Sequence, residues 1–290
     1  MAHVDEEIAS QPECWQRALD LAPKHLAQPG ERVAVVGCGT SLYIAQAYAT
    51  LRESLGLGET DAFAASEFPA ARRYDRVVAL TRSGTTTEVL DALARTRDTP
   101  TVAITGDPAT PVGAAARHVV ALEFADEKSV VQTRFATTAL VLLRAHLGAA
   151  PRDLPEQASR ALTAPLPEGA LEARQFTFLG AGWTCGVAHE AALKVREASS
   201  SWTESYPAME YRHGPISVSG PGSVVWFLGA PPAGLLPQIE RTGAQVSVSD
   251  LDPLADLIRA QRLAVRLAAG RGLDPDRPRH LTRSIVLEGS

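Results

Sequence analysis

The sequence predicts an α/β fold made of two similar domains in tandem, each with a parallel sheet. Three observations lead to this prediction. Short β-branched runs alternate with helical segments, each half has a glycine-rich turn directly after a strand, and the 290 residues exceed the roughly 150 of a typical domain. Short, continuously apolar strands are typical of parallel sheets that helices cover on both faces. We expect one domain over residues 1–150 and the second over residues 151–290.

Strand and helix alternate through the first half of the chain. A helix is expected over residues 10–28, before the first strand. Short apolar runs predict strands at 32–36, 62–65, 76–80, 101–105 and 118–122. Helical patterns separate or follow these strands, at about 41–55, 86–95 and 131–147. This order favours one parallel sheet between two layers of helices.

The pattern starts again after residues 148–169, a stretch with four prolines that we expect to be a linker with one helical segment. A strand is expected at 176–179, a helix at 185–201 and a further strand at 224–227. The stretch from 229 to 250 is short, so the second sheet is expected to be reduced.

The two halves share a motif that indicates an internal duplication. VVGCGTS at 35–41 resembles FLGAGWT at 178–184. A glutamate, Glu67 or Glu210, lies thirty residues after the first glycine of each turn, and a β-branched run follows it. A matching turn, acid and strand in the same order favour duplication over chance.

The segment Thr81–Thr87, with the sequence TRSGTTT, is the strongest candidate for a ligand site. It follows a strand and opens a helix, so its backbone amides, the helix dipole and five hydroxyl side chains would together cradle a phosphate. Arg82 adds a guanidinium that can bind an anion through two hydrogen bonds. The alternative is a simple helix cap, but five hydroxyl residues exceed what capping needs. The second half has LGAP at 228–231 instead, so we expect one anion site per chain.

Gly37-Cys38-Gly39-Thr40-Ser41 forms a second strand-to-helix turn of the same kind. The third glycine of a dinucleotide fingerprint is absent, since position 42 is leucine, and this argues against a nucleotide cofactor. Cys38 is interpreted as a small packed residue of the turn, with reactive-thiol chemistry as the alternative.

Charge and composition exclude several functional classes. The 28 basic and 33 acidic residues give a net charge of −5, which leaves no basic stripe for nucleic acid. No apolar run reaches the roughly 18 residues of a membrane span, and the acidic N-terminus is unlike a secretory signal. The three cysteines show no paired spacing, so neither disulfides nor a zinc cluster is expected. We therefore expect a cytoplasmic protein with neither a metal nor a cofactor.

In the second half, Glu190, Lys194 and Glu197 lie on one face of the helix expected at 185–201, because they are spaced by four and three residues. The alternative is a solvated Glu–Lys pair. His213 follows in a turn, where a side chain can reach a ligand, although many loop histidines are simply exposed. A carboxylate and a histidine near a phosphate site are what proton transfer beside a carbonyl requires.

Motifs along most of the chain resemble the SIS (sugar isomerase) family, in particular the isomerase half of glucosamine-6-phosphate synthase and free-standing aminosugar-phosphate deaminases, isomerases and fructosamine-phosphate deglycases. The resemblance implies two three-layer αβα, flavodoxin-like domains and a homodimer with shared active sites. The motifs are CGTS at 38–41, SEF at 66–68, TRSGTT at 81–86, TRFATTAL at 133–140, HEAALKVRE at 189–197, EYRHGP at 210–215 and DPDRPRHLTRSIVLE at 274–288.

The resemblance assigns roles to residues of both halves. Glu197 corresponds to the general base that moves a proton between C1 and C2 of a sugar, and His213 to a residue of the neighbouring subunit that helps open the sugar ring. Glu190 and Lys194 correspond to supporting positions. The resemblance implies phosphate binding by Ser41, Thr81, Arg82, Ser83 and Thr86, and a place in the sugar pocket for Thr40, Cys38, Val130, Gln132 and Arg283.

Three positions depart from the synthase pattern. Position 2 is alanine rather than the cysteine of a glutaminase, so we expect no glutamine-driven synthesis. Arg82 replaces a glutamine of the phosphate loop, which keeps the affinity for anions. Arg283 stands where the synthase has a lysine that forms a Schiff base, and a permanently protonated guanidinium cannot form that imine.

We therefore expect an enzyme that isomerises or deaminates a 6-phosphorylated amino sugar or fructosamine by proton transfer between C1 and C2. The alternative is a sensor that binds a sugar phosphate without turning it over, which the loss of the Schiff-base lysine favours. The presence of both Glu197 and His213 argues for the enzyme, because a pure binding protein needs neither.

Overall fold

The computed structural model describes residues 2–69, 71–96 and 98–287. The fold is α/β, with one parallel sheet of five strands and one of four. The chain divides into two compact units. The five-stranded unit comprises Glu13–Lys128, Gln132–Pro151 and the tail from Leu281. The four-stranded unit comprises the residues before Glu13 together with Ser129–Val131 and Arg152–His280.

All five strands predicted for the first half are present. They are β1 (Val33–Gly37), β2 (Thr60–Ala64), β3 (Arg76–Thr81), β4 (Thr101–Thr105) and β5 (His118–Ala121). The sheet is parallel throughout and has the order β2-β1-β3-β4-β5. In this flavodoxin-like order the direction of winding reverses between β1 and β3, which leaves a crevice at the carboxyl ends of these two strands.

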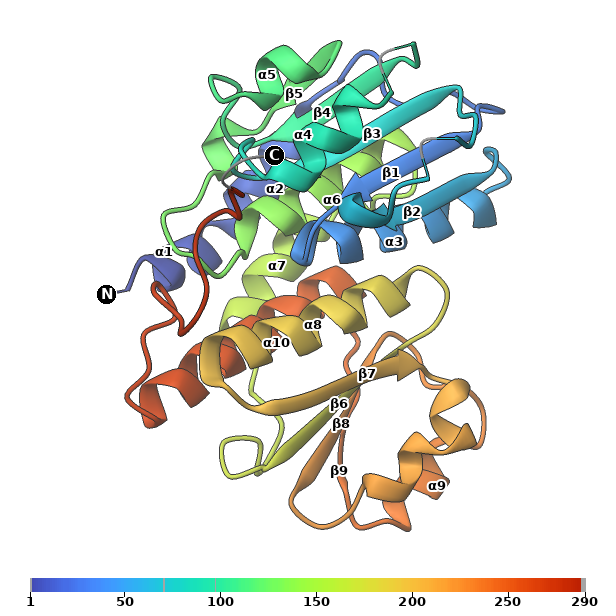
Figure 1. The fold of residues 1–290 in the computed structure, drawn as a ribbon. Helices are drawn as coiled ribbons and strands as arrows, with labels where there is room; N and C mark the ends of the chain where they lie inside the picture. Colours follow the sequence, from blue (N-terminus) through green and yellow to red (C-terminus); the bar gives the residue numbers. More distant parts are fainter. Residues whose placement is uncertain (1, 70, 97, 288–290) are drawn as a thin grey trace. The chain divides into compact units, whose positions relative to one another are not determined.

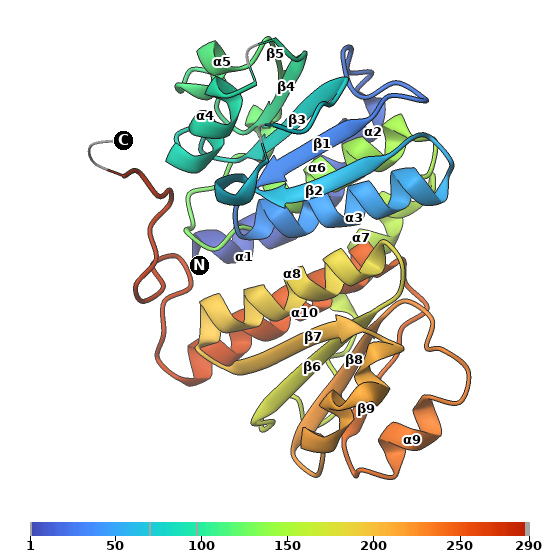
Figure 2. The ribbon, with the colours of Figure 1, turned by 45° about the vertical axis from the view of Figure 1, so that its right-hand side comes forward.

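Helices cover both faces of the five-stranded sheet. They are α2 (Gln11–Asp20), α3 (Thr40–Ser54), α4 (Thr87–Ala94), α5 (Val112–Ala115) and α6 (Arg134–His146), with short 3-10 helices at Ala65–Glu67 and Glu123–Ala125. α4 and α5 lie on one face, and α3 and α6 pack together on the other (Figures 1 and 2). The core under α4 joins Val36 and Val77 of the strands to Val89 and Leu93 of the helix.

The helix predicted over residues 10–28 is wrong in its length. α2 ends at Asp20, and residues 21–32 form no helix. Pro23 explains the early end, because proline lacks an amide hydrogen and disfavours the helical conformation in the residue before it. A separate helix, α1 (His3–Ala9), precedes α2 and belongs mainly with the four-stranded unit.

The second sheet is also parallel and has the order β7-β6-β8-β9. The two strands predicted for this half are present as β6 (Gln175–Gly180) and β8 (Ser223–Leu228). β9 (Gln245–Ser247) has three residues, and the sheet is the smaller one, as predicted. No strand is predicted over β7 (Trp202–Pro207), whose polar residues suit a strand at the edge of the sheet.

Helices cover this sheet as well. They are α7 (Leu154–Thr163), α8 (Thr184–Ser199), α9 (Leu236–Glu240) and α10 (Pro253–Gly270), with 3-10 helices η3 (Glu210–His213) and η4 (Pro215–Val218). α8 and α10 pack against each other on one face, whereas α9, η3 and η4 lie toward the other (Figures 1 and 2). The core on that second side includes Leu179, Tyr211, Phe227 and Ile239.

The two sheets repeat one connectivity. The order β7-β6-β8-β9 matches β2-β1-β3-β4, and a tight turn into a helix follows both β1 and β6. A Cβ on Gly37 would lie 2.7 Å from the Ser41 carbonyl carbon, and one on Gly180 would overlap the Thr184 carbonyl. Glycine is therefore required at both turns for the same reason. These likenesses support the predicted duplication, which stays a prediction.

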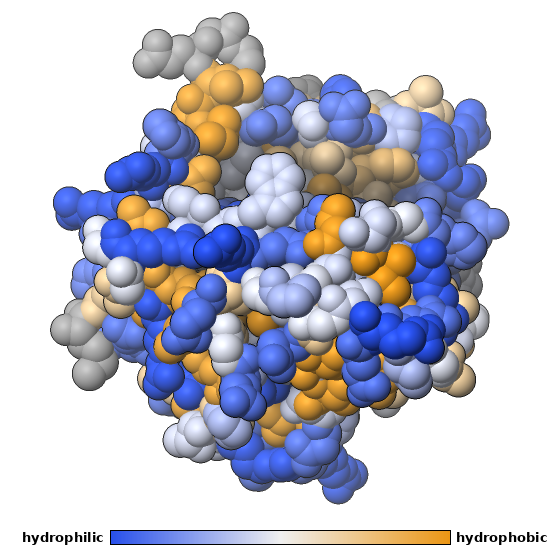
Figure 3. All heavy atoms as spheres, turned by 90° about the horizontal axis from the view of Figure 1, so that it is seen from below, coloured by the Kyte–Doolittle hydropathy of each residue, from blue (hydrophilic) through white to orange (hydrophobic). Residues whose placement is uncertain are grey.

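None of the helices within the described residues combines the length and the apolar character that a membrane crossing needs. Figure 3 shows one face of the molecule, on which hydrophobic side chains are exposed in several separate patches among hydrophilic ones. A mixed surface of this kind is ordinary for a folded domain.

Candidate functional site

The segment predicted to bind phosphate lies at the carboxyl end of β3. This strand ends at Thr81, and α4 begins at Thr87 with Thr86 as its N-cap residue. We call residues 81–87 the phosphate loop. β1 and β3 are neighbouring parallel strands, so this loop and the turn after β1 lie at the same edge of the sheet, where the strand order reverses. Open α/β sheets bind their ligands at such a point.

Gly84 fixes the conformation of the phosphate loop. Its φ of +65° lies in the left-handed region that favours glycine. A Cβ at this position would overlap Thr110 Oγ1 and lie 2.8 Å from Val112 Cγ1. The Gly84 amide donates to Thr81 Oγ1 at 3.2 Å, and its carbonyl accepts from the Val112 amide at 3.0 Å. The loop is therefore held from both sides in one conformation.

Hydroxyl groups gather at the start of α4. Ser83 Oγ accepts from the Thr85 amide at 3.3 Å and from Thr85 Oγ1 at 3.2 Å, and it lies 3.5 Å from Thr86 Oγ1. Arg82, which precedes these residues, is 2% exposed. Hydroxyls, amides at a helix N-terminus and a guanidinium are groups that bind phosphoryl oxygens. The phosphate loop therefore has the chemistry of an anion site.

The turn after β1 brings further predicted ligands to this edge of the sheet. Thr40 and Ser41 open α3, and both are buried. Cys38 packs against the core under α4. Burial, together with the charge of Glu88, raises the pKa of the Cys38 thiol. A thiol held in its protonated form is a poor nucleophile, which favours the interpretation of Cys38 as a packed residue.

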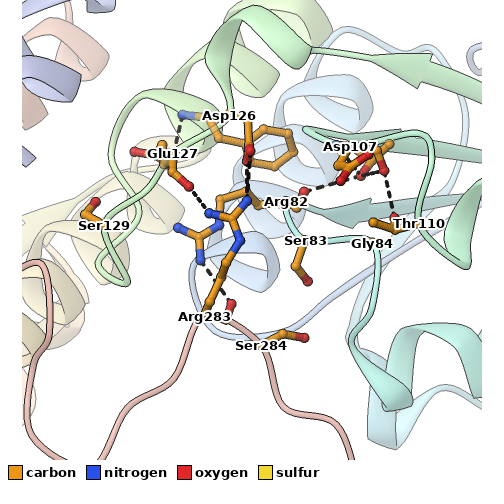
Figure 4. A network of polar contacts seen from close by, with 12 residues as sticks. Arg82, Ser83, Gly84, Asp107, Thr110, Asp126, Glu127, Ser129, Arg283 and Ser284 are labelled. Atoms are coloured by element: carbon orange, nitrogen blue, oxygen red, sulfur yellow. Dashed lines mark hydrogen bonds and ion pairs between the residues drawn. The ribbon is translucent and has the colours of Figure 1, made fainter. Parts of the chain in front are cut away.

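The Arg283 guanidinium points toward Asp126 and Glu127 (Figure 4). Its Nη2 lies 2.7 and 2.8 Å from the two Asp126 carboxylate oxygens, and its Nη1 donates to the Glu127 carbonyl. The Glu127 carboxylate in turn accepts from the Thr133 and Arg134 amides at the start of α6, at 2.6 and 2.8 Å. Sequence reasoning does not find Asp126 or Glu127, because Asp126 is 157 residues from its partner and no motif marks it.

Gln132 and Val130, predicted to line the sugar pocket, belong to different compact units. In the five-stranded unit, Gln132 Oε1 is buried and has no hydrogen-bond partner within the described part of the chain. A buried carboxamide oxygen of this kind is suited to accept from a ligand hydroxyl. In the four-stranded unit, the Val130 amide donates to the Asp276 carbonyl at 3.1 Å, and the Ser129 amide donates to the Glu7 carboxylate at 3.2 Å. No sequence motif marks Glu7 or Asp276 as the acceptors that hold the backbone of Ser129 and Val130.

Glu190, Lys194 and Glu197 lie together on α8, as their spacing predicts. Lys194 Nζ is 2.6 Å from Glu197 Oε2 and 3.5 Å from Glu190 Oε1. Glu190 and Lys194 are almost completely buried, whereas the Glu197 side chain is 20% exposed. This burial does not fit a solvated surface pair. Of the three residues, Glu197 is the one that a ligand can reach.

Glu197 lines a cavity of about 200 Å³ in the four-stranded unit. Ser200 and the segment 272–279, with Asp274, Arg277 and Arg279, line the same cavity. A carboxylate that faces a cavity and is oriented by an ammonium group can accept a proton from a bound ligand.

His213 does not lie with this carboxylate. It is exposed at the end of η3 and is not among the residues that line the cavity. η3 follows β7, whose carboxyl end pairs with the end of β6, where α8 begins. Glu197 is thirteen residues beyond Thr184 along α8, which places it about 20 Å from that edge by the rise of the helix. His213 thus follows the edge of the sheet at which α8 begins, whereas Glu197 lies near the other end of α8.

Residues 25–147, which include the turn after β1 and the phosphate loop, match the model of the SIS domain family. This chain contains a SIS domain. The match covers the five-stranded sheet, so the SIS domain carries the anion site described above.

Relatives of the SIS-domain chain are known from sequence and from structure. A glutamine–fructose-6-phosphate aminotransferase (isomerizing) of Methanothermobacter thermautotrophicus is 28% identical over 89% of this chain and 52% of its own length. The chain thus spans about half the length of the curated relatives it matches. A glucosamine-6-phosphate deaminase of Thermotoga maritima has a TM-score of 0.82 at 25% identity, over 99% of this chain and 100% of that one. The C-terminal domain of a glucosamine-fructose-6-phosphate aminotransferase of Francisella tularensis has the same fold as this chain. Its TM-score is 0.80 at 20% identity, over 96% of this chain and 98% of that one.

Proposed function

We propose that this SIS-domain chain is an enzyme of the phosphosugar isomerase type that acts on a 6-phosphorylated amino sugar or fructosamine. The observation that carries the proposal is the phosphate loop, with its hydroxyls and buried Arg82 at the start of α4. The likeness to a structure named glucosamine-6-phosphate deaminase supports this substrate class. Glu197, oriented by Lys194 and facing a cavity, supplies the base that such a reaction needs.

In the proposed reaction the phosphate anchors the substrate, so that its binding energy orients C1 and C2 for proton transfer. With an aminosugar phosphate in the open-chain form, Glu197 removes the C2 proton and returns it to C1. The aldehyde oxygen takes up a proton and the amine gives one up, which leaves an imine at C2 and a hydroxymethyl group at C1. Water then adds to the imine and ammonia leaves, so a ketose phosphate is the product.

A fructosamine phosphate, with its amine on C1, would react by the same transfer in the opposite direction. Glu197 would move the proton from C1 to C2, and hydrolysis of the resulting C1 imine would release the amine and an aldose phosphate. Without an amine, the transfer is a plain aldose–ketose isomerisation. Because Arg283 cannot form an imine, ring opening depends on acid–base catalysis, which we assign to His213.

The position of His213 supports the further proposal that the enzyme is a homodimer with shared active sites. Because His213 does not line the cavity that Glu197 of the same chain faces, we propose that His213 of the partner subunit completes the site. Met209 and Val218, on either side of His213 in the sequence, are 51% and 58% exposed. Exposed apolar residues in one region are typical of contacts between subunits.

Mixing two inactive variants tests this arrangement. Glu197→Gln and His213→Ala subunits, unfolded together and refolded in equal amounts, should regain about 25% of the wild-type activity, because half of the dimers are mixed and each holds one intact site. Mixing wild type with the Glu197→Gln/His213→Ala double variant is the control and should restore nothing beyond the wild-type homodimers. No recovery in the first mixture would show that the two residues do not act across subunits.

The second candidate function is that of a sensor. The contact of Arg283 with Asp126 favours it, because a guanidinium cannot form the imine that the resemblance implies for a lysine at this position. Thermal shift with a panel of sugar phosphates, followed by ammonia and sugar-product assays, separates the two functions. Stabilisation and product formation with one ligand would support the enzyme. Stabilisation without product from any ligand would establish the sensor.

A further inference from the structure

The tail binds the first turn of α4 through its main chain. The Thr87 amide donates to the Ile285 carbonyl at 3.1 Å, and the Leu287 amide donates back to Thr87 Oγ1 at 2.9 Å. The Arg283 carbonyl accepts from Arg82 Nη2 at 3.0 Å. Residues 283–287 thus lie directly on the phosphate loop.

A hydroxyl of the tail joins the hydroxyls of the loop. Ser284 Oγ lies 2.9 Å from Thr85 Oγ1 and 3.4 Å from Thr86 Oγ1. Figure 4 shows Ser284 beside the phosphate loop, below Ser83. A phosphate held by the loop hydroxyls would therefore have one further hydroxyl donor within reach, provided that the tail stays in this position.

Burial of apolar side chains does little to hold the tail on the phosphate loop. Ile285, Val286 and Leu287 are 49%, 64% and 53% exposed, so they contribute little hydrophobic stabilisation. The Arg283 side chain, by contrast, makes three hydrogen bonds to residues 126 and 127, two of them to one carboxylate. Both carboxylate contacts come from one nitrogen, Nη2, and they are charge-assisted, which makes them stronger than hydrogen bonds between neutral groups.

The acceptor side of this contact is rigid. The Asp126 carbonyl accepts from Arg134 Nε at 3.0 Å, and the Glu127 carboxylate is fixed by the start of α6. A Cβ on Gly106 would lie 2.9 Å from Asp126 Oδ1, so the carboxylate sits tightly against the backbone after β4. A rigid acceptor can hold a mobile donor in place.

Resting on the proposed function, we propose that Arg283 and Asp126 form a latch that holds the tail on the phosphate loop, so that Ser284 completes the phosphate site. Arg283 is then a positioning residue for phosphate binding and does not react with the sugar. The proposed role of Arg283 therefore differs from that of a lysine that forms an imine with the sugar.

Hydrogen exchange tests the latch without any ligand. In Arg283→Ala and in Asp126→Asn, the Leu287 and Thr87 amides, which donate the hydrogen bonds between the tail and α4, should exchange about fivefold faster than in the wild type, because one partly exposed ion pair is lost. The charge-reversed pair Arg283→Asp/Asp126→Arg should recover much of the protection. Arg241→Ala, which removes an exposed arginine at the end of α9, is the matched control and should leave the tail unchanged.

Calorimetry and kinetics with glucosamine 6-phosphate as the probe test the consequence. Arg283→Ala and Ser284→Ala should each raise Kd and KM about tenfold with kcat unchanged, the value of one hydrogen bond to a charged group. The ratio of the Arg283→Ala to the wild-type Kd should shrink in 0.5 M NaCl, because salt screens the exposed ion pair. A structural defect alone would not produce this salt dependence or the recovery by charge reversal.

Two results would overturn the latch. Unchanged exchange of the Leu287 and Thr87 amides in both single variants would show that the ion pair does not hold the tail. Tighter binding of the probe by Arg283→Ala would show that the tail competes with phosphate instead of completing its site. If the wild type binds no sugar phosphate at all, the proposed function fails, while the exchange measurement still decides whether the ion pair holds the tail.

Discussion

Replacing Gly84 by alanine tests whether close contact with Thr110 sets the shape of the phosphate loop. The left-handed φ of +65° alone costs about 1–2 kcal/mol for any residue other than glycine. The new Cβ would also overlap Thr110 Oγ1, which donates to the Asp107 carbonyl at 2.7 Å. Displacing this hydroxyl gives up a hydrogen bond worth about 1 kcal/mol. We therefore expect Gly84→Ala to lower the free energy of unfolding by about 2–3 kcal/mol.

Gly148→Ala is the matched control for this substitution. Gly148 has a φ of +69°, but a Cβ there would meet nothing within 4 Å, so the variant carries the backbone cost alone. Urea unfolding should show Gly84→Ala to be about 1 kcal/mol less stable than Gly148→Ala. Calorimetry with glucosamine 6-phosphate should show at least about tenfold weaker binding by Gly84→Ala and unchanged binding by Gly148→Ala, because displacing one charged-group hydrogen bond has this effect. Equal stability of the two variants, or wild-type affinity in Gly84→Ala, would refute the reasoning.

Two other groups give predictions from their pKa shifts. Two hydrogen bonds from Arg76, at 2.7 and 2.9 Å, hold the pKa of Glu31 below its ordinary value. Glu31→Gln should thus lower the unfolding free energy by about 1 kcal/mol at pH 7. This difference should shrink as the pH falls below the ordinary value of 4.5 and disappear once the pH is below the lowered pKa, since a lowered pKa means stabilisation that is lost as the pH falls. Glu59→Gln, at an exposed ion pair, is the control, and an effect of Glu31→Gln equal at pH 3 and pH 7 would contradict the reasoning. Burial and the charge of Glu88 raise the pKa of the Cys38 thiol, so iodoacetamide should modify it slowly at pH 8 and faster in Glu88→Gln. Peptide mass spectrometry measures the rate, and modification of the wild type as fast as a free thiol would contradict this expectation.

The parts of the fold that have local causes could be predicted from the sequence. The apolar runs gave β1, β3, β4 and β8 within a residue or two, because buried parallel strands need continuous apolar side chains. The turns at Gly37 and Gly180 could be identified because glycine alone fits where strand and helix approach so closely. The end of α2 was predictable in principle from Pro23, which outweighs a helical pattern. β7 was not predicted, because an edge strand with polar residues lacks the continuous apolar run that indicates a buried strand.

The candidate site divides in the same way. The spacing of Glu190, Lys194 and Glu197 was enough to place them together, because it depends only on helical periodicity. The contact between Arg283 and Asp126 depends on two segments meeting in the folded chain. A pair so far apart in sequence leaves no local pattern.

Proton transfer by Glu197 can be followed directly by NMR in ²H₂O. Wild-type protein given glucosamine 6-phosphate should place deuterium from solvent at C1 of the ketose that forms, because the base exchanges its proton with water between removal and return. Glu197→Gln should bind the same ligand with a Kd within about threefold of the wild type, since the phosphate loop is intact, and should place no deuterium at C1. Glu168→Gln, an exposed carboxylate in the linker, is the control and should behave as the wild type. Deuterium at C1 at the wild-type rate in Glu197→Gln would contradict the assignment of this carboxylate as the base.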